Sequence, residues 1–377
     1  MPTPIVLRDR YTYEDILYAY LDCRRLKRNK RSALEFELRF EDNLLTLLEE
    51  VNSGNYEIGR SEVFVVTHPK PREIWAAQFR DRIVHHLIYA DIGRYLEERF
   101  IEDTYSCIKG RGTLAASNRV TALHRRVTRN YATDCYVLQF DIKNFFVSIN
   151  KYILWDKFER HVGEPSSSLT SNLLYRVLWN DPTVNPIIKP NSQFELVPKH
   201  KSLWNVPYNY GLPIGNLLSQ VASNVYLDDF DKFVKHVLGV KAYVRYVDDA
   251  VILSTNRSEL EEWKVQIGQY LKQRLELTVH PDKCTITPAS QGINFVGYVH
   301  KPWRRYTRNC ILTTANSIVV DYSDFWTERD RVQSTINSYL GHMVHSTSFN
   351  NRRRLVDRHC IPGILTTDSN YTRLIKL

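Results

Sequence analysis

Three features typical of secreted, membrane-spanning or disulfide-stabilised proteins are missing from this sequence. No uninterrupted apolar run approaches the ~20 residues that a membrane helix needs. The N-terminal stretch MPTPIVLRDRYTYEDILYAY has no basic region followed by an apolar core. The cysteines form no CxxC pair and no dense framework; they are Cys23, Cys107, Cys135, Cys284, Cys310 and Cys360. We therefore expect a cytoplasmic protein that is neither exported nor inserted into a membrane.

Internal repeats and low-complexity tracts are also lacking, so we expect a compact and continuous chain. Its 377 residues, 43% of them hydrophobic, are enough for a sizeable core and two or three sub-domains. Lysine and arginine outnumber aspartate and glutamate by 51 to 42, which gives a net charge of +9. This excess favours a polyanionic partner.

The hydrophobic pattern predicts an alternation of helices and strands. We expect helices within residues 13–50, a strand over 61–69 and a helix over 80–100. The basic stretch CRRLKRNKRS, residues 23–32, is either a solvated loop or a phosphate-contacting patch. The proline-rich residues around 181–210 show little periodicity, so we expect an extended surface insertion there.

The stretch YVRYVDDAVIL places two adjacent aspartates, Asp248 and Asp249, inside an apolar run that favours strands. Ionised carboxylates in such surroundings are costly unless a positive charge, such as a metal ion, neutralises them. We expect strands over 243–247 and 250–253, with the acidic pair at the tip of a hairpin. Because neighbouring side chains on a strand alternate between faces, we expect Asp248 to be the direct ligand and Asp249 to support it.

A third aspartate follows another predicted strand in CYVLQFDIKNFFVSI. The run Tyr136–Phe140 predicts that strand, and Asp141 ends it. Such a residue is often a simple cap or turn residue. Together with Asp248, however, it could bind two Mg²⁺ ions about 3.5 to 4 Å apart, which is the arrangement for in-line phosphoryl displacement.

The segment GLPIGNLLSQVASNVY combines a turn with a helix start. Its glycines would let a nucleic-acid or nucleotide backbone approach closely. Asn216 is a candidate helix cap, and Leu217, Val221 and Val225 mark one face of the helix.

Four motifs in this order resemble those of bacterial reverse transcriptases; they are QFDIKNFF, GLPIGNLLSQVASNVY, YVRYVDDAVIL and GINFVGY. The resemblance extends from PKPREIWAAQF to NSYLGHMVHSTSFNNRRRL, which is most of the chain. Within these enzymes, LPIGN..SQ and SYLGHMVHS are most similar to the type found in diversity-generating retroelements. Defence-associated bacterial reverse transcriptases share the LPIGN..SQ signature.

The resemblance implies an α/β right-hand polymerase with fingers, a palm and a short helical thumb. The palm would be an antiparallel sheet with a ferredoxin-like core. The implied divisions are residues 1–134 for the fingers and the start of the palm, 135–300 for the palm with a fingers-side insertion around 181–210, and 301–377 for the thumb.

The resemblance also implies a catalytic metal centre. Asp141 and Asp248 would be its metal-bridging carboxylates, the backbone carbonyl of Ile142 a further ligand, and Asp249 the supporting acid. The cofactor would be two Mg²⁺ ions, with Mn²⁺ as a possible substitute.

For the nucleotide site, the resemblance implies that Phe146 excludes a ribose 2′-hydroxyl, although core packing competes as an explanation. Lys70 and Arg72 would clamp the incoming triphosphate, or they are solvated charges beside prolines. Ile214 and Gly215 would line the pocket. Because Ile214 replaces a glutamine of retroviral relatives, base discrimination should weaken, with errors opposite template adenine.

Further along, GINFVGY resembles a primer grip formed by Phe295, Gly297 and Tyr298. Lys283 is either a proton donor to pyrophosphate or an exposed loop lysine. The segments KPWRRYTRN and FNNRRRL suit phosphate contacts and base stacking. A zinc site is a minor alternative for the C-terminal histidines and cysteine; these are His342, His345, His359 and Cys360.

The expected function is synthesis of cDNA from a structured non-coding RNA by a bacterial or phage-encoded enzyme. Its partners would be the RNA template, a primer or cDNA strand and deoxynucleoside triphosphates. A small basic accessory protein or a defence partner is also implied, and no membrane. The alternatives are a nucleotide cyclase, which would lack fingers and thumb, and a non-catalytic RNA-binding scaffold, which would have lost its carboxylates.

Overall fold

The chain forms two compact units, each assembled from three separate stretches of sequence. The computed structural model describes residues 4–25, 27–68, 70–318, 325–360 and 365–376, without the side chains of 325–329. The first unit comprises Met1–Cys107, Ile142–Gly239 and Gln266–His280. The second comprises Ile108–Asp141, Val240–Val265 and Pro281–Leu377. The predicted boundaries after residues 134 and 300 stay a prediction.

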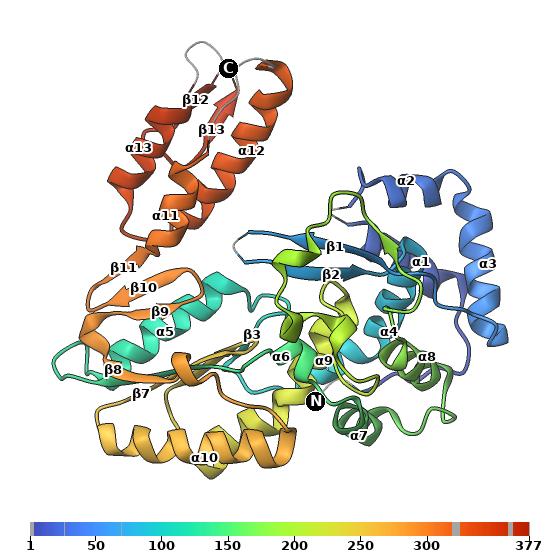
Figure 1. The fold of residues 1–377 in the computed structure, drawn as a ribbon, viewed down its shortest axis with the longest axis horizontal. Coiled ribbons are helices and arrows are strands. Elements are labelled where there is room, and N and C mark those ends of the chain that lie inside the picture. The colour runs from blue at the N-terminus through green and yellow to red at the C-terminus, as the bar shows by residue number, and fades with distance from the viewer. Residues whose placement is uncertain (1–3, 26, 69, 319–324, 361–364, 377) are drawn as a thin grey trace. The chain divides into compact units, whose positions relative to one another are not determined.

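The first unit is mainly helical (Figure 1). Its helices are α1 (Tyr13–Arg24), α2 (Arg31–Glu37), α3 (Phe40–Ser53), α4 (Phe79–Glu97), α6 (Phe145–Ser148), α7 (Lys151–Val162), α8 (Leu169–Trp179) and α9 (Leu217–Lys232), which continues into a π-helical turn at Phe233–Val237. Helix α4 contacts α1, α8 and α9, and α7 also packs on α9. The helices predicted within 13–50, over 80–100 and from residue 217 are confirmed.

A small sheet in the first unit has the strand order β2-β1-β5. Its strands are β1 (Glu62–Val66), β2 (Arg72–Ala76) and β5 (Ile187–Ile188). The predicted strand over 61–69 is confirmed as β1, and Pro69 lies outside the described residues. A further short strand, β3, is Thr104–Tyr105.

The insertion around 181–210 is attached to the small sheet of the first unit. Its β5 pairs in parallel with β1. Leu203 is buried in a cluster with Val63 and Trp75, and its backbone N–H donates to the Glu73 carboxylate at 2.9 Å. Most of its residues are exposed, as the surface prediction expects, and apolar anchors and backbone pairing also attach the insertion to the sheet. Three short 3-10 turns build the rest: Phe194–Leu196, Lys199–Lys201 and Leu203–Asn205.

The second unit contains antiparallel strands β6, β7, β4 and β8, side by side in this order. They are β4 (Tyr136–Asp141), β6 (Tyr243–Tyr246), β7 (Asp249–Ser254) and β8 (Thr285–Pro288). Helix α5 (Thr113–Val127) packs on β6 and β7, and α10 (Arg257–Leu275) follows β7. Both predicted strand regions and the predicted α/β class are confirmed.

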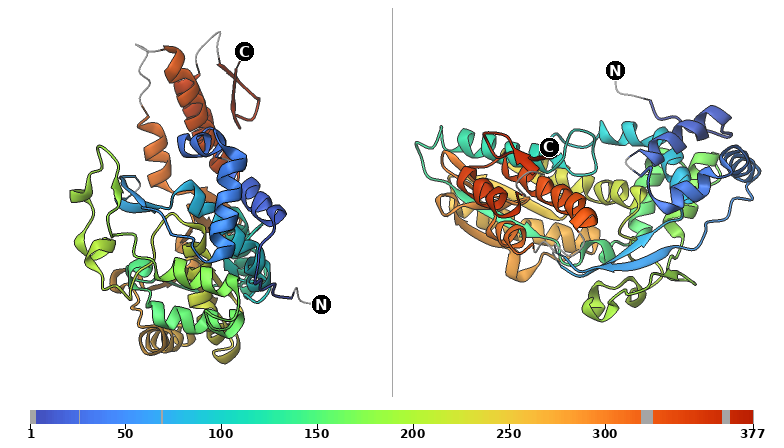
Figure 2. Two further views of the ribbon diagram at one scale, coloured as in Figure 1. Left: turned by 90° about the vertical axis from the view of Figure 1, so that its right-hand side faces the viewer. Right: turned by 90° about the horizontal axis from the view of Figure 1, so that it is seen from above.

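In the described residues of its C-terminal part, the second unit combines a three-stranded antiparallel sheet, a separate hairpin and three helices. Its elements are β9 (Ile293–Phe295), β10 (Tyr298–Lys301), β11 (Arg304–Thr307), α11 (Asn309–Asn316), α12 (Phe325–Met343), α13 (Phe349–His359), β12 (Leu365–Thr367) and β13 (Leu374–Lys376). A buried cluster that includes Leu340, Leu355 and Leu374 joins α12, α13 and β13. The helices stay side by side in the views of Figure 2. The predicted thumb is therefore helical but also carries the β12–β13 hairpin.

Buried polar contacts connect α5 with strand β10. The imidazole of His300 lies 3.3 Å from the Ser117 hydroxyl and 3.0 Å from the Thr121 hydroxyl. Burial lowers the pKa of His300 to about 3, so its ring is neutral near pH 7 and can both donate and accept. This link fixes β10 on the helix.

None of the helices among the described residues is both long enough and apolar enough to cross a membrane.

The turn between β9 and β10 depends on a glycine. Val296 and Gly297 both have positive φ, 41° and 89°, as a two-residue hairpin turn requires. A Cβ added to Gly297 would lie 2.8 Å from Cε1 of His342 in α12. Only glycine therefore lets the turn approach the helix so closely.

Replacing Gly297 by alanine should destabilise the second unit by about 1–2 kcal/mol, because a left-handed backbone and a steric contact both oppose the new methyl group. Urea unfolding monitored by circular dichroism measures this loss. The matched control is Gly341→Ala in α12, where an added Cβ meets nothing within 4 Å; we expect it to be neutral or stabilising. Equal midpoints for the two variants would contradict the assignment.

Candidate active site

The two adjacent aspartates lie at the hairpin between β6 and β7. Tyr246 pairs with Asp249 across the hairpin, so Val247 and Asp248 form a two-residue turn. Asp248 is half-buried and Asp249 is exposed, whereas the rest of β7 is buried. The predicted position of the acidic pair at a hairpin tip is confirmed.

The third aspartate reaches this hairpin through the strand register. Asp141 ends β4 and pairs directly with Asp249 of β7. Directly opposed residues of an antiparallel pair point to the same face, with Cβ atoms about 4.5–5.5 Å apart. The pleat thus brings Asp141 and Asp249 to one face of the sheet, and Asp248 precedes them in the turn. The structure therefore brings together the carboxyl groups that the sequence singled out, and Asp249, not Asp248, is the one opposite Asp141.

The turn itself is strained. Val247 has φ 57°, a left-handed conformation that costs a β-branched residue about 1–3 kcal/mol. The guanidinium of Arg245, whose residue is 1% exposed, donates to the Val247 carbonyl at 2.8 Å. This buried arginine stabilises the turn that presents the acids.

A lysine ammonium group pairs with the Asp141 carboxylate. Lys283 ends the 3-10 turn Pro281–Lys283, and its Nζ forms an ion pair with the Asp141 carboxylate. The lysine side chain is 46% exposed and that of Asp141 is 11% exposed. Lys283 is therefore partly exposed, as one interpretation expected, but it also contacts the acidic site directly.

The carboxylates of this site fit a magnesium ion whose coordination is completed by substrate phosphates. Carboxylate oxygens are the hard ligands that Mg²⁺ prefers, and it is often held by one or two carboxylates plus substrate phosphates. Among the described residues, no group of three or more His, Cys, Asp or Glu side chains has the arrangement of a ready-made metal site. Asp141 lies opposite Asp249 and Asp248 precedes Asp249 in the turn, so both carboxylates of the hairpin are available to hold an ion together with Asp141.

Ile142 and Phe146 follow Asp141 in the sequence and belong to the first unit. Ile142 is buried and forms a β-bridge with Val279. Phe145 is 2% exposed and belongs to the core, whereas Phe146 is half-buried. The core-packing interpretation thus applies to Phe145 and leaves part of the Phe146 ring accessible.

Backbone hydrogen bonds hold the predicted nucleotide-binding residues of the first unit together. The Leu212 N–H donates to the Phe146 carbonyl at 2.8 Å. The Trp75 N–H of β2 donates to the Ile214 carbonyl, also at 2.8 Å. Gly215 has φ 120°, and a Cβ there would lie 2.9 Å from the side chain of Ile74. The turn before α9 is therefore fixed on β2.

Asn216 occupies the predicted N-cap position but forms no side-chain cap hydrogen bond. Its Oδ1 accepts from the Ala77 N–H at 3.0 Å instead. The predicted cap hydrogen bond is thus wrong, because the amide instead attaches the helix start to Ala77, the residue that follows β2.

Lys70 and Arg72 stand at the start of β2, and both are exposed. Arg72 pairs in register with Val66 of β1. The exposed positions are compatible with both interpretations, a phosphate clamp and solvated charges, so the clamp stays a prediction.

The predicted primer-grip residues are mostly buried. Phe295 is 3% exposed and Tyr298 is 1% exposed, and they face each other across the β9–β10 hairpin. The Tyr298 ring stacks on His342 at 4.3 Å, and its hydroxyl donates to the His342 carbonyl at 2.8 Å. These side chains position α12, so contact with a primer stays a prediction.

The C-terminal histidines also have structural roles. His342 Nε2 lies 3.3 Å from the Gly297 carbonyl, and burial lowers the pKa of its ring. His359 Nδ1 lies 2.9 Å from the Leu355 carbonyl.

Sequence reasoning missed two residues of the acidic hairpin, Arg245 and Val247. The signal for Arg245 was a charged residue within an apolar strand, where only a specific partner repays its burial. No residue pattern indicates a left-handed valine, because the conformation follows from the two-residue turn.

The profile of the family described as "Reverse transcriptase (RNA-dependent DNA polymerase)" matches residues 68–300. The chain belongs to the reverse transcriptase family. The matched region contains the acidic hairpin, Asp141 and the nucleotide-site candidates, so the predicted enzyme class, RNA-directed DNA polymerase, and the right-hand polymerase fold are confirmed. No curated protein matches the chain.

Three solved structures are similar to this reverse transcriptase. Apo telomerase from Candida tropicalis truncated from its C-terminal domain gives a TM-score of 0.48 at 13% identity, over 66% of this chain and 55% of that one. Telomerase from Candida albicans in complex with a fragment of telomeric RNA gives 0.47 at 11% identity, over 81% and 54%. Apo telomerase from Candida tropicalis gives 0.47 at 12% identity, over 80% and 56%. The chain thus spans little more than half the length of these proteins.

Lys283→Met should strengthen the response of the protein to divalent cations, because the ammonium group no longer competes for the Asp141 carboxylate. We expect MgCl₂ or MnCl₂ to raise the unfolding temperature of this variant more than that of the unmodified protein. The matched control is Lys189→Met, whose side chain is 47% exposed and pairs with Glu62. An equal or smaller shift in Lys283→Met would show that the lysine and the cation do not share Asp141.

Proposed function

We propose that this reverse transcriptase copies a cognate structured non-coding RNA into cDNA by two-metal-ion nucleotidyl transfer. The observation that carries the proposal is the pairing of Asp141 with Asp249 next to Asp248 in the hairpin turn. Three carboxyl groups at adjoining strand ends are hard to explain as a structural device, since they repel one another unless cations neutralise them.

In this proposal each of the three aspartates has its own role in binding cations. Asp141 and Asp248 would hold the metal ions together with the Ile142 carbonyl, and Asp249 would support them. Two bound Mg²⁺ ions, or Mn²⁺ in their place, would activate the attacking oxygen and stabilise the leaving oxygen. Lys283, which pairs with Asp141 in this structure, would then be available to contact the reacting phosphates.

Residues of the first unit are assigned to the incoming deoxynucleoside triphosphate. Lys70 and Arg72 clamp its phosphates, since lysine and arginine donors suit phosphate oxygens. Phe146 excludes a ribose 2′-hydroxyl, which its half-buried ring supports. Ile214 and Gly215 line the pocket at the turn fixed on β2.

The hairpin of Phe295, Gly297 and Tyr298 is assigned to the primer strand. Because its aromatic side chains are buried, the contact with the primer would come from backbone groups or from the position of α12.

For the biological role, we propose the error-prone enzyme of a diversity-generating retroelement, working in the cytoplasm of a bacterium. The support is the LPIGN..SQ signature together with Ile214, whose apolar side chain forms no hydrogen bond to the base or sugar. A small basic accessory protein would assemble with it. The alternative is an antiphage defence enzyme with its own RNA and partner, because such enzymes share the signature. The intact carboxyl groups argue against a non-catalytic RNA-binding scaffold, and the reverse transcriptase family match argues against a nucleotide cyclase.

Separate Asp141→Asn and Asp248→Asn variants should lose primer extension by at least about 10³-fold, because each removes one of the charges that hold the cations. Asp249→Asn should lose less if it only supports them. Extension of a labelled primer on an RNA template, with the native RNA present, measures all three. The matched control is Asp156→Asn, an exposed aspartate of α7. Full activity of Asp141→Asn would overturn the proposal.

Sequencing the cDNA made in cells tests the biological role. Errors concentrated at template adenine support diversification, and Ile214→Gln should then reduce them, because an amide can again hydrogen-bond the substrate. Repetitive or phage-induced cDNA would instead support the defence role. An unchanged error spectrum in Ile214→Gln would remove Ile214 as the cause.

A further inference from the structure

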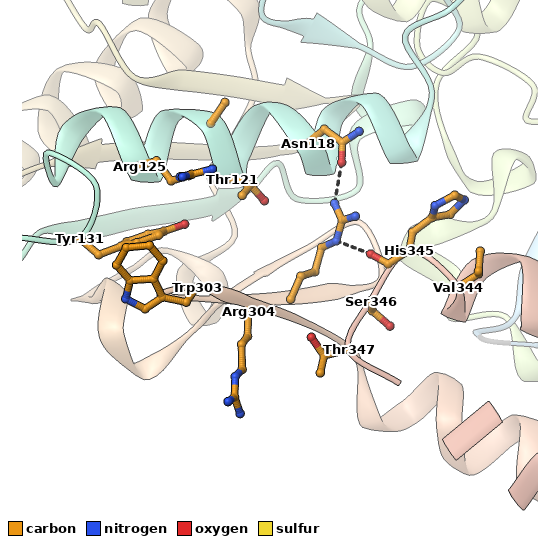
Figure 3. A pocket seen from close by; sticks show the side chains of 12 residues that line it. Asn118, Thr121, Arg125, Tyr131, Trp303, Arg304, Val344, His345, Ser346 and Thr347 are labelled. Atoms are coloured by element: carbon orange, nitrogen blue, oxygen red, sulfur yellow. Dashed lines mark hydrogen bonds between the residues drawn. The ribbon is translucent and has the colours of Figure 1, made fainter. Parts of the chain in front are cut away.

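A cleft in the second unit remains without an assigned role. Its volume is about 650 Å³, within the usual range for ligand pockets. It is lined by residues of α5, of the segment that follows α5, of the β10–β11 hairpin and of the segment between α12 and α13 (Figure 3). None of the acidic, nucleotide-site or primer-grip residues described above lines it.

The lining carries positive charge without a single acidic residue. Arg125 donates to the Asn130 side-chain oxygen at 3.1 Å. Arg305 donates to the Asn118 side-chain oxygen at 2.7 Å and to the His345 carbonyl at 2.7 Å. Among the described residues these partners are all neutral, so the charges of both guanidinium groups stay uncompensated. Arg304, which is exposed, adds a third.

A second cleft of similar size, in the first unit, also contains arginines, but there they have acidic neighbours. It measures about 690 Å³. Arg160 forms ion pairs with Asp156 and Asp229. The Arg160 guanidinium is thus paired with acidic residues of its own cleft, whereas the lining of the second-unit cleft has no acidic residue to pair with its arginines.

One end of the charged cleft is aromatic. Trp303, in the two-residue turn between β10 and β11, is 67% exposed, and its backbone has φ 63°. Its ring lies 4.8 Å from that of Tyr131, edge to face. Figure 3 shows the two rings at one end and His345 and Val344 at the other. Tyr131 thus holds the Trp303 ring at the end of the cleft, where its exposed surface is accessible to a ligand.

The frame around these side chains is fixed before any ligand binds. The Thr347 N–H donates to the Arg305 carbonyl at 2.7 Å, and the hydroxyl groups of Thr307 and Ser346 lie 2.7 Å apart. Burial lowers the pKa of Arg305 below its ordinary value. Because the frame is already fixed, little conformational entropy of the protein is lost when a ligand binds.

We propose that this cleft binds an unpaired nucleotide of a single nucleic-acid strand. Its base would stack on the exposed face of Trp303, and its phosphates would contact Arg125, Arg304 and Arg305. A single strand offers both an aromatic face and a negative charge, which is what the lining complements. A paired base offers no free face, so a duplex fits less well.

A neighbouring cleft indicates a strand rather than a free mononucleotide. It measures about 570 Å³, shares Thr347 with the first, and is lined by Lys301 and Arg308 but by no acidic residue. Phosphates on either side of the bound nucleotide would therefore continue to meet positive charge.

Binding of a fluorescein-labelled single-stranded RNA, followed by anisotropy, tests the site. The full chain is first saturated with an unlabelled blunt duplex, so that duplex-binding surfaces are occupied. Trp303→Ala should weaken RNA binding about 10-fold, and Trp303→Phe should retain most of the affinity, because a ring face remains. Arg304→Gln should lower the slope of log affinity against log salt by about one.

The matched control for charge is Arg160→Gln in the cleft of the first unit. It removes an arginine that is already ion-paired with Asp156 and Asp229, so it should leave RNA affinity and the salt slope unchanged. Unfolding temperatures check that each variant is folded, and the exposure of Trp303 predicts no loss. The outcome is independent of catalysis, since no nucleotide is added.

Equal binding by Trp303→Ala and the unmodified protein would overturn the proposal. Displacement of the RNA by polyglutamate as effectively as by unlabelled RNA would also overturn it and would indicate an acidic protein segment as the ligand. A DNA strand of the same sequence distinguishes the source of the nucleotide: tighter RNA binding supports an RNA ligand with a 2′-hydroxyl contact, and equal binding supports either strand.

Discussion

The mutual repulsion of carboxyl groups at the end of one sheet governs the active-site architecture. Asp141 and Asp249 are held opposite each other by the pairing of β4 with β7, and Asp248 stands next to them in a strained turn. The surrounding strands are buried, and Lys283 and Arg245 supply positive charge nearby. The proposed exchange of the ammonium group for metal ions would use the same charge balance.

Much of this site could be predicted from the sequence because it depends on local patterns. An apolar run interrupted by Asp248 and Asp249 indicates a hairpin tip, and the run from Tyr136 indicates a strand that ends at Asp141. The order of four motifs then indicates the family. Local pattern was less informative at Asn216, where the position was right but the amide bonds Ala77, just after β2, instead of its own helix.

Features that depend on long-range contacts could not be predicted. The ion pair of Lys283 with Asp141 joins residues far apart in sequence. The same is true of the burial of Tyr298 against His342, which gives a predicted nucleic-acid contact a packing role. The insertion around residues 181–210 lies at the surface as expected, but its attachment to a sheet through Leu203 and β5 could not be predicted, because the prolines leave no periodic pattern.

The division of the chain into interleaved units limits how this protein can be dissected. Asp141 is the last residue of one stretch of the second unit, and Ile142 opens the next stretch of the first. Since the backbone passes repeatedly from one unit to the other, a cut at any single peptide bond between them would leave at least one unit incomplete. Neither unit corresponds to one continuous fragment, so deletion mapping with truncated chains would report misfolding rather than the location of a function.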